Sequence, residues 1–416
     1  MSGGNGRQFF VDVAPLRASR GFRWLFGGMT LSVTARQFTI VAVPYQVYQL
    51  TGSTLLVGAL GIAQLIPLLL TSVVGGAVVD SVDRRRLLLL TQVLLAATAT
   101  GLAVNAALDE PQVWLVFLLA GLNAGISAID NPSRSASIPA LVGERYLAQA
   151  FAIIQTLFNI AKTAGPAIGG LLIAQAGLTV SFAAEAVLFG LSAVALLRLP
   201  SLVPEGGGRR FGVESIREGF SFLRDRRLLQ ANFLADINAM VFGAPQALFP
   251  ALGETVLGGD ATTVGILFAA PGAGALVAAV TSGWVGSVKR HGRVIIIAIA
   301  SWGAAIAAVG LSRSLWPMVF FLAVAGAADV ASAVFRTTLL QAAVPDELRG
   351  RLSAIHVGVV AGGPRIGDFR AGAVASLTSP QMSLVSGGVM CILGVLAIAK
   401  WLPELPAYRP PHDQEE

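Results

Sequence analysis

The stretch GGAVVDSVDRRRLLLL (residues 75–90) places two carboxylates and three consecutive arginines between two runs of apolar residues. Apolar runs of about 18 residues or more, long enough to cross a bilayer, recur along almost the whole chain. Only 12% of the 416 residues are charged and the mean hydropathy is +0.72, whereas a soluble domain carries about 25% charged residues. The sequence therefore predicts an all-α integral membrane protein in which such charged stretches are turns between spans.

Twelve transmembrane helices are predicted from the alternation of apolar segments and short polar turns. They cover residues 24–49, 54–79, 87–107, 112–130, 150–176, 179–198, 229–252, 262–286, 293–312, 315–338, 353–376 and 381–402. The longest interruption (199–227) is rich in Pro, Gly and charge. We therefore expect two six-helix bundles, at 1–198 and 229–403, with a cytoplasmic linker at 199–228 and a cytoplasmic tail at 404–416.

Basic residues gather in alternate loops. One set of loops holds the arginines at 84–86, the cluster at 198–227 and Lys289, whereas the other set holds only Arg313. Because loops rich in Lys and Arg stay on the cytoplasmic side, we expect a multi-pass protein of the bacterial cytoplasmic (inner) membrane with both termini in the cytoplasm. The net charge of +6 is then explained by the lipid bilayer, and no nucleic-acid partner is expected.

The two halves of the chain echo each other. GAVVDSVDRRR (76–86) follows the second predicted span, and GWVGSVKRHGR (283–293) follows the eighth. RSASIPALV (134–142) and RTTLLQAAV (336–344) correspond in the same way, after the fourth and tenth spans. Repeated halves around a site near the bilayer midplane are typical of transporters. The repeat predicts that the bundles are related by a pseudo-two-fold axis.

The turn after the second span resembles the cytoplasmic loop motif of the major facilitator superfamily. The residues that carry this resemblance are Gly76, Asp80, Arg84, Arg85 and Arg86, and the departures from the motif are Ser81 and Asp83. The resemblance implies the major facilitator fold. It also implies that these residues form a cytoplasmic gate that latches the two halves, with Asp80 facing the eleventh span.

The fifth span resembles the Gly-Pro-x-x-Gly-Gly motif of proton-driven exporters in the superfamily. The matching residues are Gly165, Pro166, Gly169 and Gly170. Pro166 removes a backbone donor, and the glycines allow another helix to approach closely, although ordinary helix packing remains an alternative. DNPSRSASIPALV (130–142), PDELRGRLSA (345–354) and PRIGDFRAGAVAS (364–376) resemble a narrower group, that of the enterobactin exporter and multidrug efflux proteins.

Polar side chains within the spans are costly and mark candidate residues of a substrate or proton pathway. They are Arg36, Gln155, Asn159, Lys162, Glu185, Asp236 and Asp329. Asp236 is the preferred proton carrier, because burial favours the protonated form of a carboxyl group; a fixed pair with an arginine is the alternative. Arg36 also has two interpretations: it contacts an anionic substrate, or it forms an ion pair with an acid on a neighbouring span. Arg365 and Asp368, three residues apart, are expected to form a structural pair.

Enzymatic functions are not indicated. The chain has no Gly-x-x-x-x-Gly-Lys-Ser/Thr phosphate loop, and three scattered His and a single Cys provide no catalytic or metal set. We expect no cofactor, with the proton gradient as energy source, and no obligatory protein partner.

The predicted function is that of a secondary active transporter. It is a proton-coupled exporter (antiporter) whose small-molecule cargo is a siderophore or a small amphipathic drug, moved by alternating access. A nutrient importer of the same fold is one alternative. A non-transporting membrane sensor or scaffold is another, which the short tails disfavour.

Overall fold

The computed structural model describes residues 12–203, 218 and 221–409, and this part of the chain is helical almost throughout, with no β-strand. The first half contains α1 (Ala14–Ala18), α2 (Arg20–Thr51), α3 (Thr54–Ser81), α4 (Arg84–Ala106), α5 (Val113–Val142) and α6 (Leu147–Leu196). The second half contains α8 (Arg227–Gly243), α9 (Phe249–Ala251), α10 (Ala261–Val280), α11 (His291–Leu311), α12 (Leu315–Ala343), α13 (Asp346–Leu377), α14 (Pro380–Trp401) and α15 (Glu404–Ala407).

Eight of the described helices are long and apolar enough to cross a membrane. One of these, α6, is 50 residues long and divides at Gly177, whose φ of 82° is a conformation that favours glycine. The break falls in the gap between the predicted spans 150–176 and 179–198. Adding the second part of α6 and the helices α2, α8 and α13 gives the twelve spans that the sequence predicts.

The predicted span 229–252 differs from the structure because it is not continuous. Helix α8 ends at Gly243, and a 3₁₀ turn (Gln246–Leu248), α9 and a π-helical turn (Leu252–Val256) follow. Pro245 and Pro250 lack the backbone donor that a continuous helix needs. The pattern of apolar residues does not indicate such a break, but the two prolines do.

Helix α13 supplies the hydrogen bonds that the break in the seventh span removes. Arg370 donates from Nε to the carbonyl of Val241 at 3.0 Å and from Nη2 to that of Phe242 at 3.2 Å. The carboxylate of Asp368 accepts the N–H of Ala247 at 3.0 Å on the other side of the break. Since freed backbone groups in a membrane must be satisfied within the protein, these two side chains stabilise the interruption.

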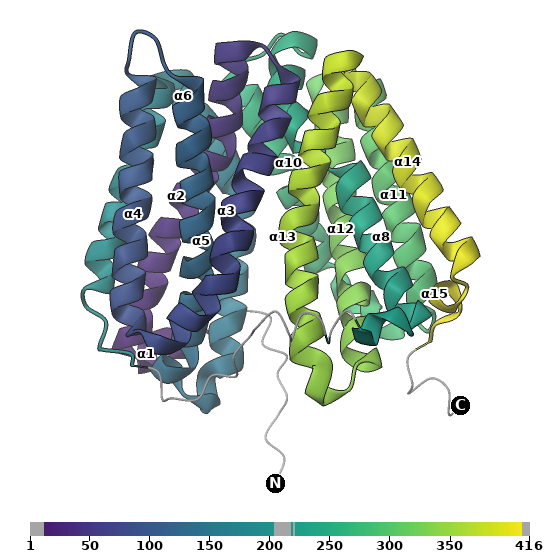
Figure 1. The fold of residues 1–416 in the computed structure, drawn as a ribbon, viewed down its shortest axis with the longest axis horizontal. Coiled ribbons are helices and arrows are strands. Elements are labelled where there is room, and N and C mark those ends of the chain that lie inside the picture. Colours follow the sequence, from purple (N-terminus) through teal and green to yellow (C-terminus); the bar gives the residue numbers. More distant parts are fainter. Residues whose placement is uncertain (1–11, 204–217, 219–220, 410–416) are drawn as a thin grey trace.

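The helices form two bundles that stand side by side, α2 to α6 and α8 to α14 (Figure 1). Helices α1 and α15 lie at the same end of the molecule, which we call the terminal face; the opposite end is the distal face. Near the distal face α3 packs against α13 and α6 packs against α10. A Cβ on Gly58 would lie 2.6 Å from the carbonyl oxygen of Asp368, so these helices approach backbone to backbone.

The buried apolar clusters show where the halves are joined. One cluster contains residues of both halves, such as Val43 and Val57 with Phe249 and Leu267. Two other clusters, one around Phe22 and Ile138 and one around Phe233 and Phe335, are each confined to one half. The halves are therefore packed together toward the distal face and have separate cores toward the terminal face.

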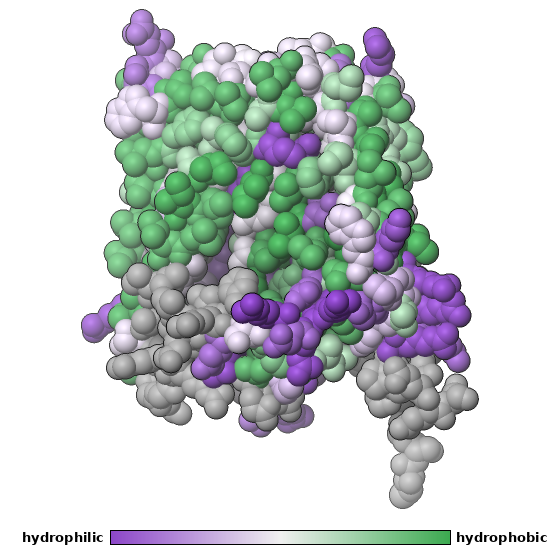
Figure 2. Space-filling view, turned by 45° about the vertical axis from the view of Figure 1, so that its right-hand side comes forward, coloured by the Kyte–Doolittle hydropathy of each residue, from purple (hydrophilic) through white to green (hydrophobic). Residues whose placement is uncertain are grey.

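An apolar belt surrounds the molecule. Figure 2 shows hydrophobic side chains over the middle and upper part of one face, with polar side chains gathered toward the lower end. Large apolar residues such as Leu70, Val280 and Leu377 are 66%, 79% and 86% exposed. Exposed tryptophans lie near helix ends, Trp316 at the start of α12 and Trp401 at the end of α14. Lipid-facing hydrocarbon with tryptophan at its borders is the surface of a membrane-spanning protein.

Candidate transport site

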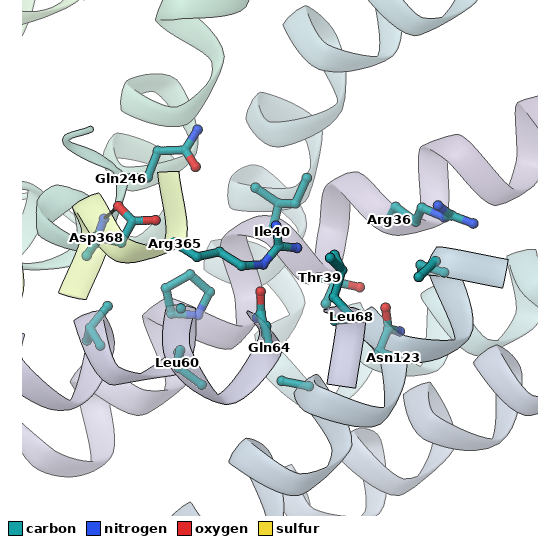
Figure 3. A pocket seen from close by; sticks show the side chains of 18 of the residues that line it. Arg36, Thr39, Ile40, Leu60, Gln64, Leu68, Asn123, Gln246, Arg365 and Asp368 are labelled. Carbon is teal, nitrogen blue, oxygen red and sulfur yellow. Dashed lines mark hydrogen bonds between the residues drawn. The ribbon is translucent and has the colours of Figure 1, made fainter. Parts of the chain in front are cut away.

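A cavity of about 320 Å³ lies between the two halves. Its polar lining comes from Arg36, Thr39, Gln64, Asn123, Ser127, Asn131, Gln246, Arg365 and Asp368, and its apolar lining includes Ile40, Leu60, Leu68 and Phe268. Residues from α2, α3 and α5 thus meet residues from α13 and the broken seventh span (Figure 3). A cavity of this size, with apolar walls and converging polar groups, fits a small organic ligand.

A second cavity continues from the first toward the terminal face. Its volume is about 630 Å³, and it shares Arg36 and Asn131 with the first cavity. Its other lining residues include Ile138 and Phe151, on the parts of α5 and α6 that lie nearer the terminal face. The two cavities adjoin at Arg36 and Asn131, whose side chains share a hydrogen bond of 2.9 Å, whereas packing between the halves closes the distal face.

Arg36 pairs with an acid on a neighbouring helix. Its Nη2 lies 2.5 Å from Oδ2 of Asp130, and Nε of Arg134 lies 2.8 Å from the same oxygen. Thr91 and Gln92 donate to Oδ1 of Asp130 at 2.8 and 2.9 Å. The Asp130 side chain is fully buried. Of the two interpretations of Arg36, the structure shows the ion pair, and sequence reasoning missed its partner although Asp130 begins the quoted stretch 130–142.

Glu185 lies behind the cavity wall rather than in it. Its carboxylate is fully buried and accepts a hydrogen bond from the hydroxyl of Thr39, which lines the central cavity. Arg36 also interacts with it electrostatically. The predicted pathway residues Arg36 and Glu185 are thus brought together on one side of the cavity.

The second half contains a comparable buried cluster. Nη1 of Arg336 lies 2.6 Å from Oδ1 of Asp236, and Nη2 lies 3.8 Å from Oδ1 of Asp329. Nδ1 of His356 lies 3.5 Å from the other oxygen of Asp236. The side chains of Asp236 and Arg336 are 1% and 2% exposed, whereas that of Asp329 is 45% exposed. One guanidinium therefore serves two carboxylates with different access to solvent.

The two clusters follow the internal repeat. Arg134 and Arg336, which occupy equivalent sequence positions, are both 2% exposed and both hold a carboxylate. His356 is the member of the second cluster that sequence reasoning set aside, because a lone histidine in an apolar helix has no distinguishing local pattern. Among the described residues, no group of three or more His, Cys, Asp or Glu could hold a metal ion.

The polar stripe on α6 divides between two environments. Gln155 donates to Asn159 at 3.3 Å and lines the second cavity. Lys162 is exposed and interacts electrostatically with Asp329 of the other half. The stripe therefore faces the space between the halves.

Arg365 and Asp368 both line the central cavity and interact electrostatically, but their charged groups are not in direct contact. Arg365 donates from Nη1 to the carbonyl of Ala361 at 2.5 Å, and Asp368 accepts the N–H of Ala247. Their spacing of three residues places them on one helix face, but the broken seventh span lies beside Asp368 and takes its carboxylate instead.

The glycine motif of α6 lies in the distal closure. Cβ atoms added at Gly165 and Gly169 would meet Gln37 and Phe38 of α2, and one added at Gly170 would meet the backbone of α10 at Gly265. Pro166 is buried beside them. The motif therefore lets α6 contact one helix of each half.

The arginines of the loop motif contact their own half. Arg84 donates to the carbonyl of Ala136 at 3.0 Å and Arg85 to that of Leu197 at 2.7 Å, while Arg86 is exposed. The latch between the halves that the resemblance implies stays a prediction. The side-chain surroundings of Gly76 and Asp80 lie outside the described residues.

Asp83 connects the same loop to the segment that leaves α6. Burial of Asp83 opposes its ionisation, but hydrogen bonds from the Ser201 hydroxyl (2.7 Å) and from the N–H groups of Leu202 (3.0 Å) and Arg85 (2.9 Å) outweigh it and hold the pKa of Asp83 below its usual range. Sequence reasoning identified Asp83 only as a departure from the motif.

Comparison with known proteins adds independent information. Residues 11–412 match the family model described as transmembrane secretion effector. The chain is 29% identical over 400 residues to the enterobactin exporter EntS of Shigella boydii serotype 4 (strain Sb227) and 28% identical to that of Escherichia coli O81 (strain ED1a), with 95% of each chain covered.

Solved structures share the fold at low sequence identity. The nucleoside transporter NupG aligns with a TM-score of 0.72 at 13% identity, covering 94% of this chain and all of that one. A bacterial homologue of the human lysosomal transporter Spinster, solved in an inward-facing and unoccupied conformation, aligns with a TM-score of 0.69 at 16% identity, covering 94% and 96%.

Proposed function

The chain belongs to the transmembrane secretion effector family of major facilitator transporters, which are not enzymes, and from this premise we propose that it is a proton-coupled exporter of a siderophore or another small amphipathic molecule. The observation that carries the proposal is the cavity between the halves, with packed helices on its distal side and a second cavity toward the terminal face. One conformation of an alternating-access transporter has this geometry.

The orientation of the chain in the membrane follows from the charge of the terminal face, whereas the similarity to exporters supports the direction of transport. The loops that the sequence assigns to the cytoplasm, including Arg84 to Arg86, lie at this face. By the bias of Lys and Arg toward the cytoplasm, the terminal face, with α1 and α15, is cytoplasmic, in the inner membrane of a bacterium. For an exporter, the cytoplasm is then the side from which cargo enters the central cavity.

The cluster of the second half supports proton coupling through Asp236. The guanidinium of Arg336 lies 2.6 Å from the carboxylate of Asp236 and 3.8 Å from that of Asp329, which is the more exposed of the two acids. Protonation of Asp236 weakens its attraction for Arg336, so that the guanidinium moves toward Asp329. His356, at 3.5 Å, is placed to pass a proton to Asp236. Protonation is thereby linked to a rearrangement between α8, α12 and α13.

The test is transport into inside-out vesicles with an imposed proton gradient, acid inside. Enterobactin and a cationic dye are supplied in parallel to wild type, Asp236→Asn and the exposed-loop control Asp109→Asn. Gradient-dependent accumulation by wild type and the control, reduced at least about tenfold in Asp236→Asn, supports the proposal. Accumulation that ignores the gradient refutes proton coupling. Movement only in the opposite direction indicates an importer.

A further inference from the structure

The guanidinium of Arg365 makes one hydrogen bond within the described structure, to the carbonyl of Ala361, and has an electrostatic interaction with Asp368. Arg36, the other arginine that lines the central cavity, is paired with Asp130, whereas Arg365 donates to the carbonyl of Ala361. The Nε atom of Arg365 is buried and has no hydrogen-bond partner in the described structure. Because a guanidinium carries five N–H donors, most of the donating capacity of Arg365 is available to a ligand.

The charges on α13 leave a positive excess at the cavity. Asp368 is the one acidic residue among the described lining residues, and its carboxylate accepts the N–H of Ala247. Arg365 and Arg370 both interact with it electrostatically, while Arg370 is held by two backbone carbonyls. One carboxylate thus interacts with two guanidiniums, of which that of Arg365 lines the cavity. On the other wall, Arg36 and Arg134 are balanced by Asp130 and Glu185.

Two amides complete the surroundings of Arg365. Figure 3 shows its side chain extending from α13 toward Ile40 of α2, with Gln64 of α3 near the guanidinium and Gln246 of the broken span on the side of Asp368. No side-chain hydrogen bond of either glutamine is present in the described structure, so both amides can donate to a ligand oxygen. Leu60 and Phe268 supply an apolar wall to the same cavity. The site therefore presents cationic and neutral donors beside a hydrocarbon surface.

We propose that Arg365 binds an oxyanion of the cargo, and that the cavity selects small amphipathic anions, such as aromatic carboxylates and phenolates, over amides and cations. Arginine pairs with a carboxylate through two parallel, charge-assisted hydrogen bonds. The proposal deepens the export function and rests on it for the statement that the bound anion is cargo. The binding site itself is tested without transport.

The first measurement is binding to the full chain in lipid nanodiscs, with 2-naphthoate, 2-naphthamide and 2-naphthylmethylammonium as probes of equal ring size. Wild type is expected to bind the carboxylate at least about tenfold more tightly than the amide, since a hydrogen bond to a charged group is the stronger kind. Arg365→Gln removes this preference. Arg365→Lys retains part of it, because the charge stays and the planar fork is lost. Arg313→Gln, at an exposed loop, leaves it unchanged.

Equal affinity of wild type for carboxylate and amide overturns the proposal, and this comparison needs no variant. Unchanged naphthoate binding in an Arg365→Gln protein that elutes and unfolds like wild type overturns it as well. The vesicle assay separates the two hypotheses. If wild type prefers naphthoate to naphthamide but shows no gradient-driven transport, the export function alone is refuted. If wild type transports cargo but binds naphthoate and naphthamide equally, the Arg365 site alone is refuted.

Discussion

At the residue scale, Asp130 is the point where three helices are tied together by charge. One carboxylate oxygen serves Arg36 of α2 and Arg134 of α5, and the other accepts hydrogen bonds from Thr91 and Gln92 of α4. All of this lies within the first half, and Arg36 lines both cavities. A neutral side chain at position 130 would leave the buried guanidiniums of Arg36 and Arg134 without the negative charge of Asp130.

We expect Asp130→Asn to destabilise the protein by about 3–5 kcal/mol, the usual effect of removing one partner from a buried ion pair. The measurement is thermal or denaturant unfolding of the purified protein in a fixed detergent, with Asp109→Asn in an exposed loop as the control. Equal stability of the two variants contradicts the importance assigned to this cluster.

Asp83 gives a prediction for pH. Since its folded pKa is depressed, its contribution to stability is fully present above the unfolded pKa of about 3.9 and disappears as pH falls through the lower folded pKa. We expect the difference in melting temperature between wild type and Asp83→Ala to be constant from about pH 7 to 5 and to shrink below about pH 4. A difference that grows on acidification gives the opposite sign and refutes the assignment.

The sequence predicted polar residues within spans better than it predicted their partners. Arg36 and Asp236 stand out because charge is costly among apolar neighbours. The contact of Arg36 with Asp130 could not be predicted in this way, because the two residues lie 94 positions apart and only the fold brings them together. Arg365 and Asp368 are not in direct contact for a related reason. Their spacing places them on one face of α13, but it cannot predict that the N–H of Ala247, on another segment, donates to Asp368.

At the element scale, the break of the seventh span is held by α13. Two carbonyls released at the end of α8 accept hydrogen bonds from Arg370, and the N–H of Ala247 beyond the break donates to Asp368. The apolar pattern correctly predicted that a span exists here, but it predicted a continuous helix, because periodicity reports burial and is insensitive to where backbone hydrogen bonds are interrupted.

We expect Arg370→Gln to destabilise the protein by roughly 1–3 kcal/mol, the cost of leaving a buried polar group unsatisfied, and to increase hydrogen exchange at residues 241–247. Exchange mass spectrometry in nanodiscs checks this, with Arg313→Gln as a control of the same chemistry on the surface. Protection at 241–247 equal to wild type would show that α13 does not support the break.

At the scale of the whole molecule, glycines close the distal face. Gly170 of α6 lies against the backbone of α10, where an added Cβ would be 2.7 Å from the Cα of Gly265. Gly58 and Gly61 of α3 approach α13 in the same way. The sequence motif indicated close packing of α6, and the internal repeat indicated two halves. Which end of the molecule is closed depends on many contacts across the halves and was not predicted.

Gly170→Leu should therefore open the distal face. The matched control is Gly190→Leu on the same helix, where an added Cβ meets nothing within 4 Å.

A cross-link between the halves reports whether the distal face is closed. Gln49 and Glu254 come from different halves and share a hydrogen bond near this face, so both are replaced with cysteine. The single native cysteine, Cys391, is buried. We expect efficient cross-linking in the parent and in the Gly190→Leu protein. In the Gly170→Leu protein it should fall several-fold, because a leucine cannot fit where two backbones touch. Equal cross-linking in all three proteins would mean that closure does not depend on this contact, and the halves would then be held at the distal face by the apolar cluster that they share.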